Sequence, residues 1–158
     1  MENIEKIKNK KAVIILSVII VVTLLFIWLH SCMDMETSSE ESGFFYKLLC
    51  PFFEIFMGKG NVTELFIRKL AHFTEFLGLG LELMLYMHLL INEKKIILVI
   101  SAWVIGTFCA IIDESIQLLS GRGSQIADVW LDSFGCITGV LIMMGIYIIY
   151  KKRHLAKS

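Results

Sequence analysis

The sequence has little that would interrupt a long helix or solubilise its surface: one proline, Pro51, in 158 residues, and only 19% charged residues. Soluble domains carry about a quarter charged residues, so this composition is not typical of a soluble fold. The 15 basic and 15 acidic residues balance, and nucleic-acid binding, which normally shows as a basic excess, is not expected. The four cysteines lack the C-x-x-C spacing of metal sites, and those in apolar runs are expected to pack as small hydrophobic side chains.

Long apolar runs are abundant instead. Apolar residues make up 56% of the chain, and its mean hydropathy is +0.72. A bilayer core about 30 Å thick needs roughly 20 largely apolar residues per helix. Four segments approach or exceed that length, residues 12–29, 65–91, 96–119 and 127–150. Because short connections join the last three, we predict a single all-α membrane domain over residues 1–158, an antiparallel bundle of about four transmembrane helices.

Basic residues near the ends of these spans favour one orientation. With the N-terminus inside, the lysine and arginine clusters within residues 6–11, 94–95 and 151–157 all lie in the cytoplasm, as the positive-inside rule requires. We therefore expect both chain ends in the cytoplasm. An alternative interpretation of the first span is a cleaved signal peptide. Its apolar run over residues 12–29 exceeds the roughly 7–15 residues of such peptides, which favours an uncleaved anchor helix.

The segment between the first two spans has two parts. Residues 33–42 are polar and acidic and predict a solvated link. Residues 43–57 are rich in aromatic side chains and predict one or two short helices, either lying in the outer membrane interface or packed against the spans. Asn61, with Glu64 three residues later, predicts the N-cap of the second span. Residues 61–63 also spell a glycosylation acceptor, but capping accounts for the same asparagine.

Charged and polar residues inside the later spans form a pattern. A charge at the centre of a membrane helix costs about 2.5–3.5 kcal/mol on insertion scales. Those of the second span share one helical face: Arg68, His72, Glu75 and Glu82. The others are Asp113, Glu114 and Gln117 late in the third span, Arg122 in the loop, and Asp128 and Asp132 on one face of the fourth. At about 1.5 Å per residue, all but Glu82 fall in the outer half of the bilayer, where we expect them to meet as one polar cluster.

This polar cluster has a structural and a functional interpretation. Ion pairs and hydrogen bonds between helices can simply hold a membrane bundle together. Clamping needs only one or two such groups, however, so the number of charged residues here favours a functional pocket. Gly135 and Gly139 share the face of Asp128 and Asp132 and form a small-xxx-small pattern, which predicts close packing against a neighbouring helix.

The sequence defines the chemistry of the cluster less well. His72 and Glu75 share a helical face, and acids on other helices could complete a metal site with them, but the motif is short, and neither a metal nor a cofactor is predicted. Adjacent residues on a helix, such as Asp113 and Glu114, point about 100° apart and do not form a natural acid–base pair. No Ser-x-x-Lys or G-x-S-x-G motif is present. Catalysis is left open, with a non-enzyme favoured, and no catalytic residue is assigned.

Two stretches carry a resemblance to a known family. Residues 68–76, RKLAHFTEF, resemble the R-K-x-x-H-F-x-E-[YF] stretch of VanZ-like membrane proteins. Residues 113–117, DESIQ, with Arg122, Asp128, Gly135 and Gly139 after them, are similar to the second motif of that family, D-E-x-x-Q…R…D…N-x-x-G-x-x-x-G. The resemblance covers about residues 65–145. It is broken at Asp132, where the family usually has asparagine, so that a potential charge replaces a neutral hydrogen-bonding group.

The resemblance implies a multi-pass protein of the bacterial cytoplasmic membrane. For the founding members it implies a role in resistance to teicoplanin, a glycopeptide antibiotic with an acyl tail that binds cell-wall precursors. The family has no settled enzymatic activity, and many of its members lie outside any resistance setting.

Residues and resemblance together favour a pocket for an amphipathic ligand in contact with membrane lipids, either a lipoglycopeptide antibiotic or a lipid-linked cell-wall precursor. Arg68 and Arg122 would engage phosphate or carboxylate, because the guanidinium fork suits both. His72 and Glu75 would orient the head group, while the remaining acids and the amide would position the arginines or accept ligand donors (Asp113, Glu114, Gln117 and Asp128). The role of Asp132 is open. The alternatives are an enzyme that modifies a lipid or lipid-linked precursor and a small transporter, and a homo-oligomer is compatible with each.

Overall fold

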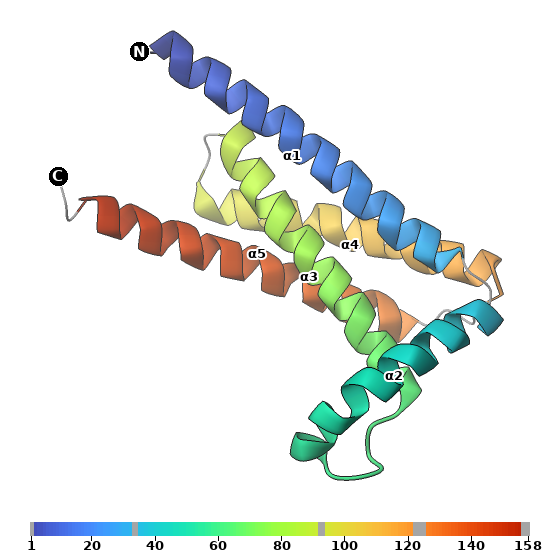
Figure 1. The fold of residues 1–158 in the computed structure, drawn as a ribbon. Helices are drawn as coiled ribbons and strands as arrows, with labels where there is room; N and C mark the ends of the chain where they lie inside the picture. The colour runs from blue at the N-terminus through green and yellow to red at the C-terminus, as the bar shows by residue number, and fades with distance from the viewer. Residues whose placement is uncertain (1, 33–34, 92–93, 122–125, 156–158) are drawn as a thin grey trace.

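The computed structural model describes residues 2–32, 35–91, 94–121 and 126–155, with side chains over 10–32, 43–91, 94–121 and 126–153. These residues form five α-helices (Figure 1). Their bounds are Glu2–Ser31 for α1, Met35–Met57 for α2, Glu64–Leu90 for α3, Lys95–Leu119 for α4 and Ile126–Leu155 for α5. No strand is present in the described part of the chain, which confirms the all-α prediction.

Four of the helices are long and apolar enough to cross a membrane. The candidate spans are Lys10–Ser31, Glu64–Leu90, Lys95–Leu119 and Ile126–Arg153, close to the predicted segments. The helix α1 begins well before its apolar part and continues through the lysine-rich N-terminal segment. Lysine is a good helix former, so a charged segment of this kind extends a helix readily. Residues 92–93, within the short connection predicted between the second and third spans, lie outside the described residues.

The segment before α3 differs from the prediction in two ways. Residues 35–42, expected to form a solvated link, belong to α2, which continues as one helix through Pro51 to Met57. The N-cap of α3 is Thr63, whose hydroxyl accepts a hydrogen bond from the Phe66 amide at 3.1 Å, so the prediction of Asn61 is wrong. Asn61 instead donates its side-chain amide to the Met57 carbonyl at 2.7 Å and closes the end of α2.

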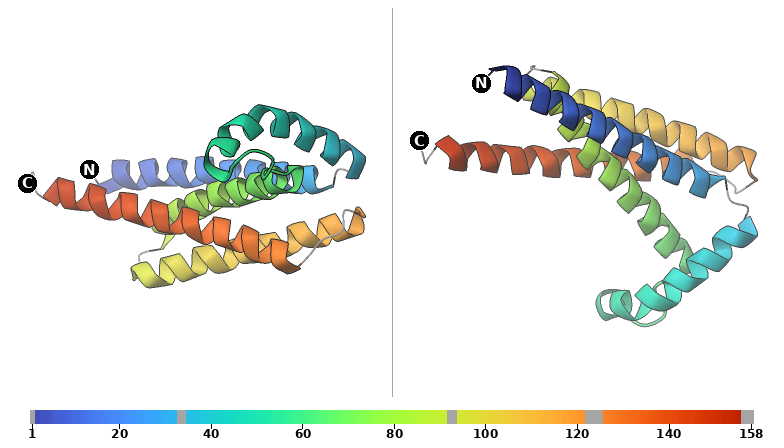
Figure 2. Two further views of the ribbon diagram at one scale, coloured as in Figure 1. Left: turned by 90° about the horizontal axis from the view of Figure 1, so that it is seen from below. Right: turned by 45° about the horizontal axis from the view of Figure 1, so that its top comes forward.

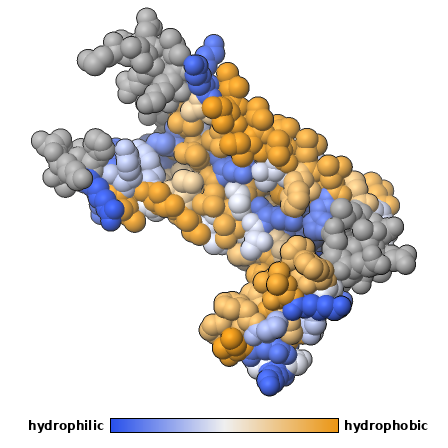
Figure 3. Space-filling view, viewed as in Figure 1, coloured by the Kyte–Doolittle hydropathy of each residue, from blue (hydrophilic) through white to orange (hydrophobic). Residues whose placement is uncertain are grey.

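The helix α3 is the centre of the bundle. It contacts α1, α2, α4 and α5, and its contact with α5 is the most extensive of these (Figure 1). The two ends of the chain lie at the same end of the bundle, while α2 projects from the opposite end (Figure 2). The core between the helices is built from buried apolar side chains such as Phe76, Leu79, Ala102 and Val140. The outward face of α1 and much of the outer surface are apolar, with polar side chains gathered in the middle of the face shown (Figure 3).

Glycines set the distance between α3 and α5. A Cβ atom added at Gly139 would lie 2.1 Å from the Leu77 carbonyl oxygen, and one at Gly135 would lie 2.4 Å from that of Phe73. Gly80 of α3 approaches α5 in the same way, because its Cβ would lie 2.1 Å from the Cys136 carbonyl oxygen. Backbone atoms cannot move aside as a flexible side chain can. The two helices therefore pack closely only because these positions carry no side chain.

Replacing Gly139 with alanine is expected to destabilise the bundle. The added methyl group forces α3 and α5 apart, and overpacking of this kind costs about 1–3 kcal/mol. Gly145→Ala is a matched control on α5, because its Cβ meets nothing within 4 Å, and alanine there improves helix propensity by up to about 1 kcal/mol. The thermal unfolding midpoint of the detergent-purified protein should fall for Gly139→Ala and hold or rise for Gly145→Ala. Equal midpoints would contradict the packing described here.

Candidate functional site

The polar cluster predicted from the sequence assembles between three helices near the α2 end of the bundle. Its members come from α3 (Arg68, His72 and Glu75), from α4 (Asp113, Glu114 and Gln117) and from α5 (Asp128 and Asp132). Several are deeply buried: Asp113 is 0% exposed, Asp132 1% and Glu114 5%. Arg122, the remaining predicted member, lies outside the described residues. The helical spacing of these residues therefore brings one face of each helix into a common polar interior.

The helix α1 contributes two polar side chains that are not among the predicted site residues. The Ser31 hydroxyl donates a hydrogen bond to Asp113 Oδ1 at 2.7 Å, and His30 Nδ1 lies 3.1 Å from Glu75 Oε1. The His30 ring also stacks on His72, with ring centroids 6.0 Å apart. His30 and Ser31 end an otherwise apolar run, and this polar pair is the sequence feature that could have indicated their place in the site. The last turn of α1 thus completes the fourth side of the cluster.

Asp113 accepts hydrogen bonds at both of its carboxylate oxygens. One oxygen accepts from Ser31, and the other accepts from the Gln117 side-chain amide at 2.8 Å. His72 Nδ1 lies 3.9 Å from the second oxygen and 3.6 Å from Glu75 Oε2. A carboxylate buried in a membrane protein needs such partners, because leaving it unpaired costs several kcal/mol. Asp113 is therefore held in a fixed orientation by α1 and α4.

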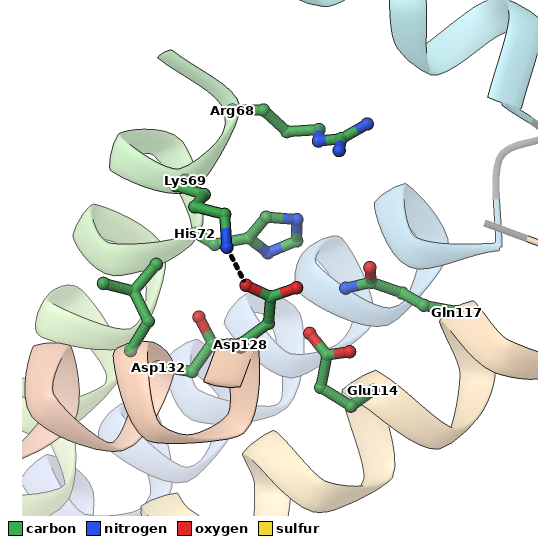
Figure 4. A pocket seen from close by; sticks show the side chains of 8 residues that line it. Arg68, Lys69, His72, Glu114, Gln117, Asp128 and Asp132 are labelled. Atoms are coloured by element: carbon green, nitrogen blue, oxygen red, sulfur yellow. Dashed lines mark hydrogen bonds and ion pairs between the residues drawn. The ribbon is translucent and has the colours of Figure 1, made fainter. Parts of the chain in front are cut away.

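A small pocket opens beside this network. It encloses about 30 Å³, and its lining is drawn in Figure 4: Arg68, Lys69, His72, Glu114, Gln117, Asp128, Leu131 and Asp132. A water molecule needs only about 10–15 Å³ of such space, so the pocket admits an ion with a water molecule or a single small group. Lys69 forms an ion pair with Asp128 across the pocket. The pocket is lined almost entirely by groups that carry charge or donate hydrogen bonds.

Arg68 stands apart in this pocket. Its half-buried guanidinium makes no hydrogen bond or ion pair with any residue that the structure describes, and it extends away from the carboxylates (Figure 4). Lys69, its neighbour, is neutralised by Asp128. A guanidinium presents donors in a planar fork that matches carboxylate and phosphate. Arg68 is thus a cation in the lining of the pocket that no described residue neutralises.

Whereas Arg68 is a half-buried cation, Asp132 is a deeply buried acid. Both of its carboxylate oxygens are buried and accept no hydrogen bond from any described residue. It faces His72 and Asp113, and one ligand atom from each of the three residues lies within 4.8 Å of the others. Ionised carboxylates at this density repel each other unless a proton or a cation lies between them. Asp132 is therefore a buried carboxylate that no described residue satisfies.

Other polar residues of the spans act as contacts between helices. Glu82 accepts a hydrogen bond from Thr23 at 2.9 Å and ties α3 to α1, away from the pocket. The buried Ser133 accepts from the Trp103 indole at 2.9 Å and lies 2.8 Å from the Thr107 hydroxyl, which ties α5 to α4. These sites show how the bundle is clamped with neutral or singly charged groups. The polar cluster is larger and more acidic than such clamps require.

The sequence matches the model of one known protein family. The family model described as VanZ/LLP1 matches residues 14–150, which include every helix except the first part of α1 and the end of α5. No curated protein and no solved structure matches the chain significantly. The match covers most of the chain and all members of the polar cluster. The chain therefore belongs to the VanZ/LLP1 family.

Proposed function

We propose that this multi-pass membrane protein binds the anionic head group of an amphipathic ligand at the mouth of the pocket. The observation that carries the proposal is Arg68, a half-buried arginine without an ion-pair partner among the described residues, above a polar pocket. Holding an unpaired charge within a membrane protein is expensive, and such residues are functional by default. A phosphate or carboxylate would supply the missing partner through two parallel hydrogen bonds.

The surroundings of Arg68 suit a ligand with an apolar tail. The pocket is too small to enclose more than one small group, so most of the ligand would lie outside it, along the helices. Beside the start of α3, the helix α2 exposes Phe52, Ile55 and Phe56, and Phe53 packs edge-on against Phe66 of α3. Aromatic side chains of this kind gather at the membrane interface. The ligand class is therefore an amphiphile, with its head at Arg68 and its tail against apolar helix surfaces.

Two classes of anionic amphiphile are consistent with the resemblance to VanZ-like proteins. One is a lipid-linked cell-wall precursor, which carries phosphate on a polyprenyl tail. The other is a lipoglycopeptide such as teicoplanin, which carries an acyl tail and a carboxylate, and binding it would contribute to resistance. Both present an anion beside an apolar chain, so the same site would serve either.

The ligand can be tested with a matched pair of polyprenyl compounds. We expect the detergent-purified protein to bind a polyprenyl phosphate at least about tenfold more tightly than the corresponding polyprenyl alcohol, because a charge-assisted bidentate contact contributes about 1.5–3 kcal/mol. Arg68→Gln should remove that preference. Lys59→Gln, which removes an exposed cation away from the pocket, should leave it intact.

A parallel arm compares teicoplanin with vancomycin, which lacks the long acyl tail. Preferential binding of teicoplanin that depends on Arg68 would point to the antibiotic as the ligand. Preference for the polyprenyl phosphate alone would point to the wall precursor. If the wild-type protein prefers none of these anionic amphiphiles to its control compound, the proposal is wrong.

The location of the site in the outer half of the bacterial cytoplasmic membrane requires a particular orientation. We propose that both chain ends are cytoplasmic, in accord with the basic clusters and with the two ends lying at the same end of the bundle (Figure 2). The last turn of α1 and the exposed Cys32 just after it then face outward together with the pocket.

This orientation predicts the labelling of cysteines in intact cells. In a background with Cys50 replaced by alanine, a maleimide that does not cross membranes should label Cys32, because it is exposed just beyond α1. Lys152→Cys, at the exposed end of α5 and combined with Cys32→Ala, should react only after lysis. Labelling of the cysteine at 152 in intact cells would place the pocket on the cytoplasmic side.

A further inference from the structure

The geometry points to a divalent metal site formed by His72, Asp113 and Asp132 at the inner wall of the pocket. This differs from the sequence-based expectation of no metal. One side chain comes from each of α3, α4 and α5, a convergence that no sequence motif displays. The donor set of one imidazole nitrogen and two carboxylate oxygens suits a divalent ion such as Zn²⁺ or Mn²⁺.

The distances are close to those of a coordinated ion. One ligand atom from each of the three residues lies within 4.8 Å of the other two. Metal–ligand bonds of about 2.1 Å place two ligand atoms of a tetrahedral ion roughly 3.4 Å apart. Side-chain shifts of somewhat under about 1 Å for each ligand would therefore close the site. Rotations of this size need no movement of the helix backbones.

The state of Asp132 is an independent sign that something is bound here. Its side chain is 1% exposed, and its two oxygens accept no hydrogen bond from the described residues while facing His72 and Asp113. Buried polar atoms in folded proteins nearly always have a partner, and an ion is one of the partners that accounts for an exception. Asp113 in contrast is oriented by Ser31 and Gln117, as the outer partners of a metal ligand usually orient it.

The local charge balance favours a cation. Arg68 and Lys69 are the permanent cations among the described residues of the cluster. Five carboxylates lie together with them, those of Glu75, Asp113, Glu114, Asp128 and Asp132. Counting Arg122, which lies outside the described residues, still leaves more acids than permanent cations. A divalent ion between Asp113 and Asp132 would offset most of that excess.

The proposed ion would border the pocket. His72 and Asp132 both line the pocket, so an ion held by them has one side open to its interior. Three protein ligands leave a coordination position for water or for an incoming oxygen. If the proposed head-group binding holds, a phosphate oxygen would take that position while Arg68 binds the same phosphate from outside. The metal site itself does not depend on that ligand.

Metal binding can be measured without any ligand. Tag-free, detergent-purified protein is stripped with EDTA and titrated with Mn²⁺, and the loss of the free-ion electron paramagnetic resonance signal reports binding. We expect one saturable Mn²⁺ site per chain, which Zn²⁺ displaces. Asp132→Asn and His72→Gln should each weaken binding by at least about tenfold, because each replaces a carboxylate or an imidazole with a neutral amide, which is a weaker metal ligand. Glu82→Gln is the matched control, since it neutralises a carboxylate on α3 outside the pocket and should bind as the wild type does.

A second measurement needs no variant. X-ray absorption of the Zn²⁺-loaded wild-type protein should show a first shell of oxygen and nitrogen with one imidazole. The absence of saturable Mn²⁺ or Zn²⁺ binding by the wild type would overturn the inference. A sulfur-containing shell would do the same, and so would an equal loss of affinity in Glu82→Gln. If metal binds but the polyprenyl phosphate does not, the metal site stands and the proposed function fails.

Discussion

The burial of several carboxylates in one place is the constraint on which the rest of this structure depends. Inside a membrane protein each such group needs a hydrogen-bond donor, a cation or a proton, because neither water nor lipid supplies one. Asp113 finds donors on Ser31 and Gln117, Asp128 pairs with Lys69, and Glu75 lies against His30. The hydrogen bonds and ion pairs of these carboxylates thus hold the helices in register. Asp132 is the group for which the described residues supply no such partner.

The glycines of α3 and α5 make this concentration of charge possible. Gly80, Gly135 and Gly139 let the two backbones approach closely, which brings His72 near Asp132 across the interface. Larger residues would separate the helices and disperse the cluster. Close packing and the polar site are therefore linked, and a change at a glycine far from any ligand is expected to alter the site as well as the stability.

Much of the fold and part of the site could be predicted from sequence. Apolar runs fix the spans because the bilayer demands their length, and the period of 3.6 residues puts His72 and Glu75 on one face. The capping residue could not be chosen, because Asn61 and Thr63 both suit an N-cap, and Asn61 is used to close α2. The roles of His30 and Ser31 depend on how α1 packs against α3 and α4, which no local pattern reports. Likewise, the facing of Asp132 and His72 arises only from the assembled bundle.

The central claim is that the cluster exists to bind something rather than to clamp helices, and the stability of Asp132→Asn tests it most directly. The measurement is the thermal unfolding midpoint of the purified protein in the presence of EDTA. Asparagine has nearly the same shape and carries no charge, so it removes the cost of burying a carboxylate that no described residue satisfies. We predict a midpoint equal to or higher than that of the wild type. A clearly lower midpoint would show that Asp132 holds the bundle together, and it would contradict the account.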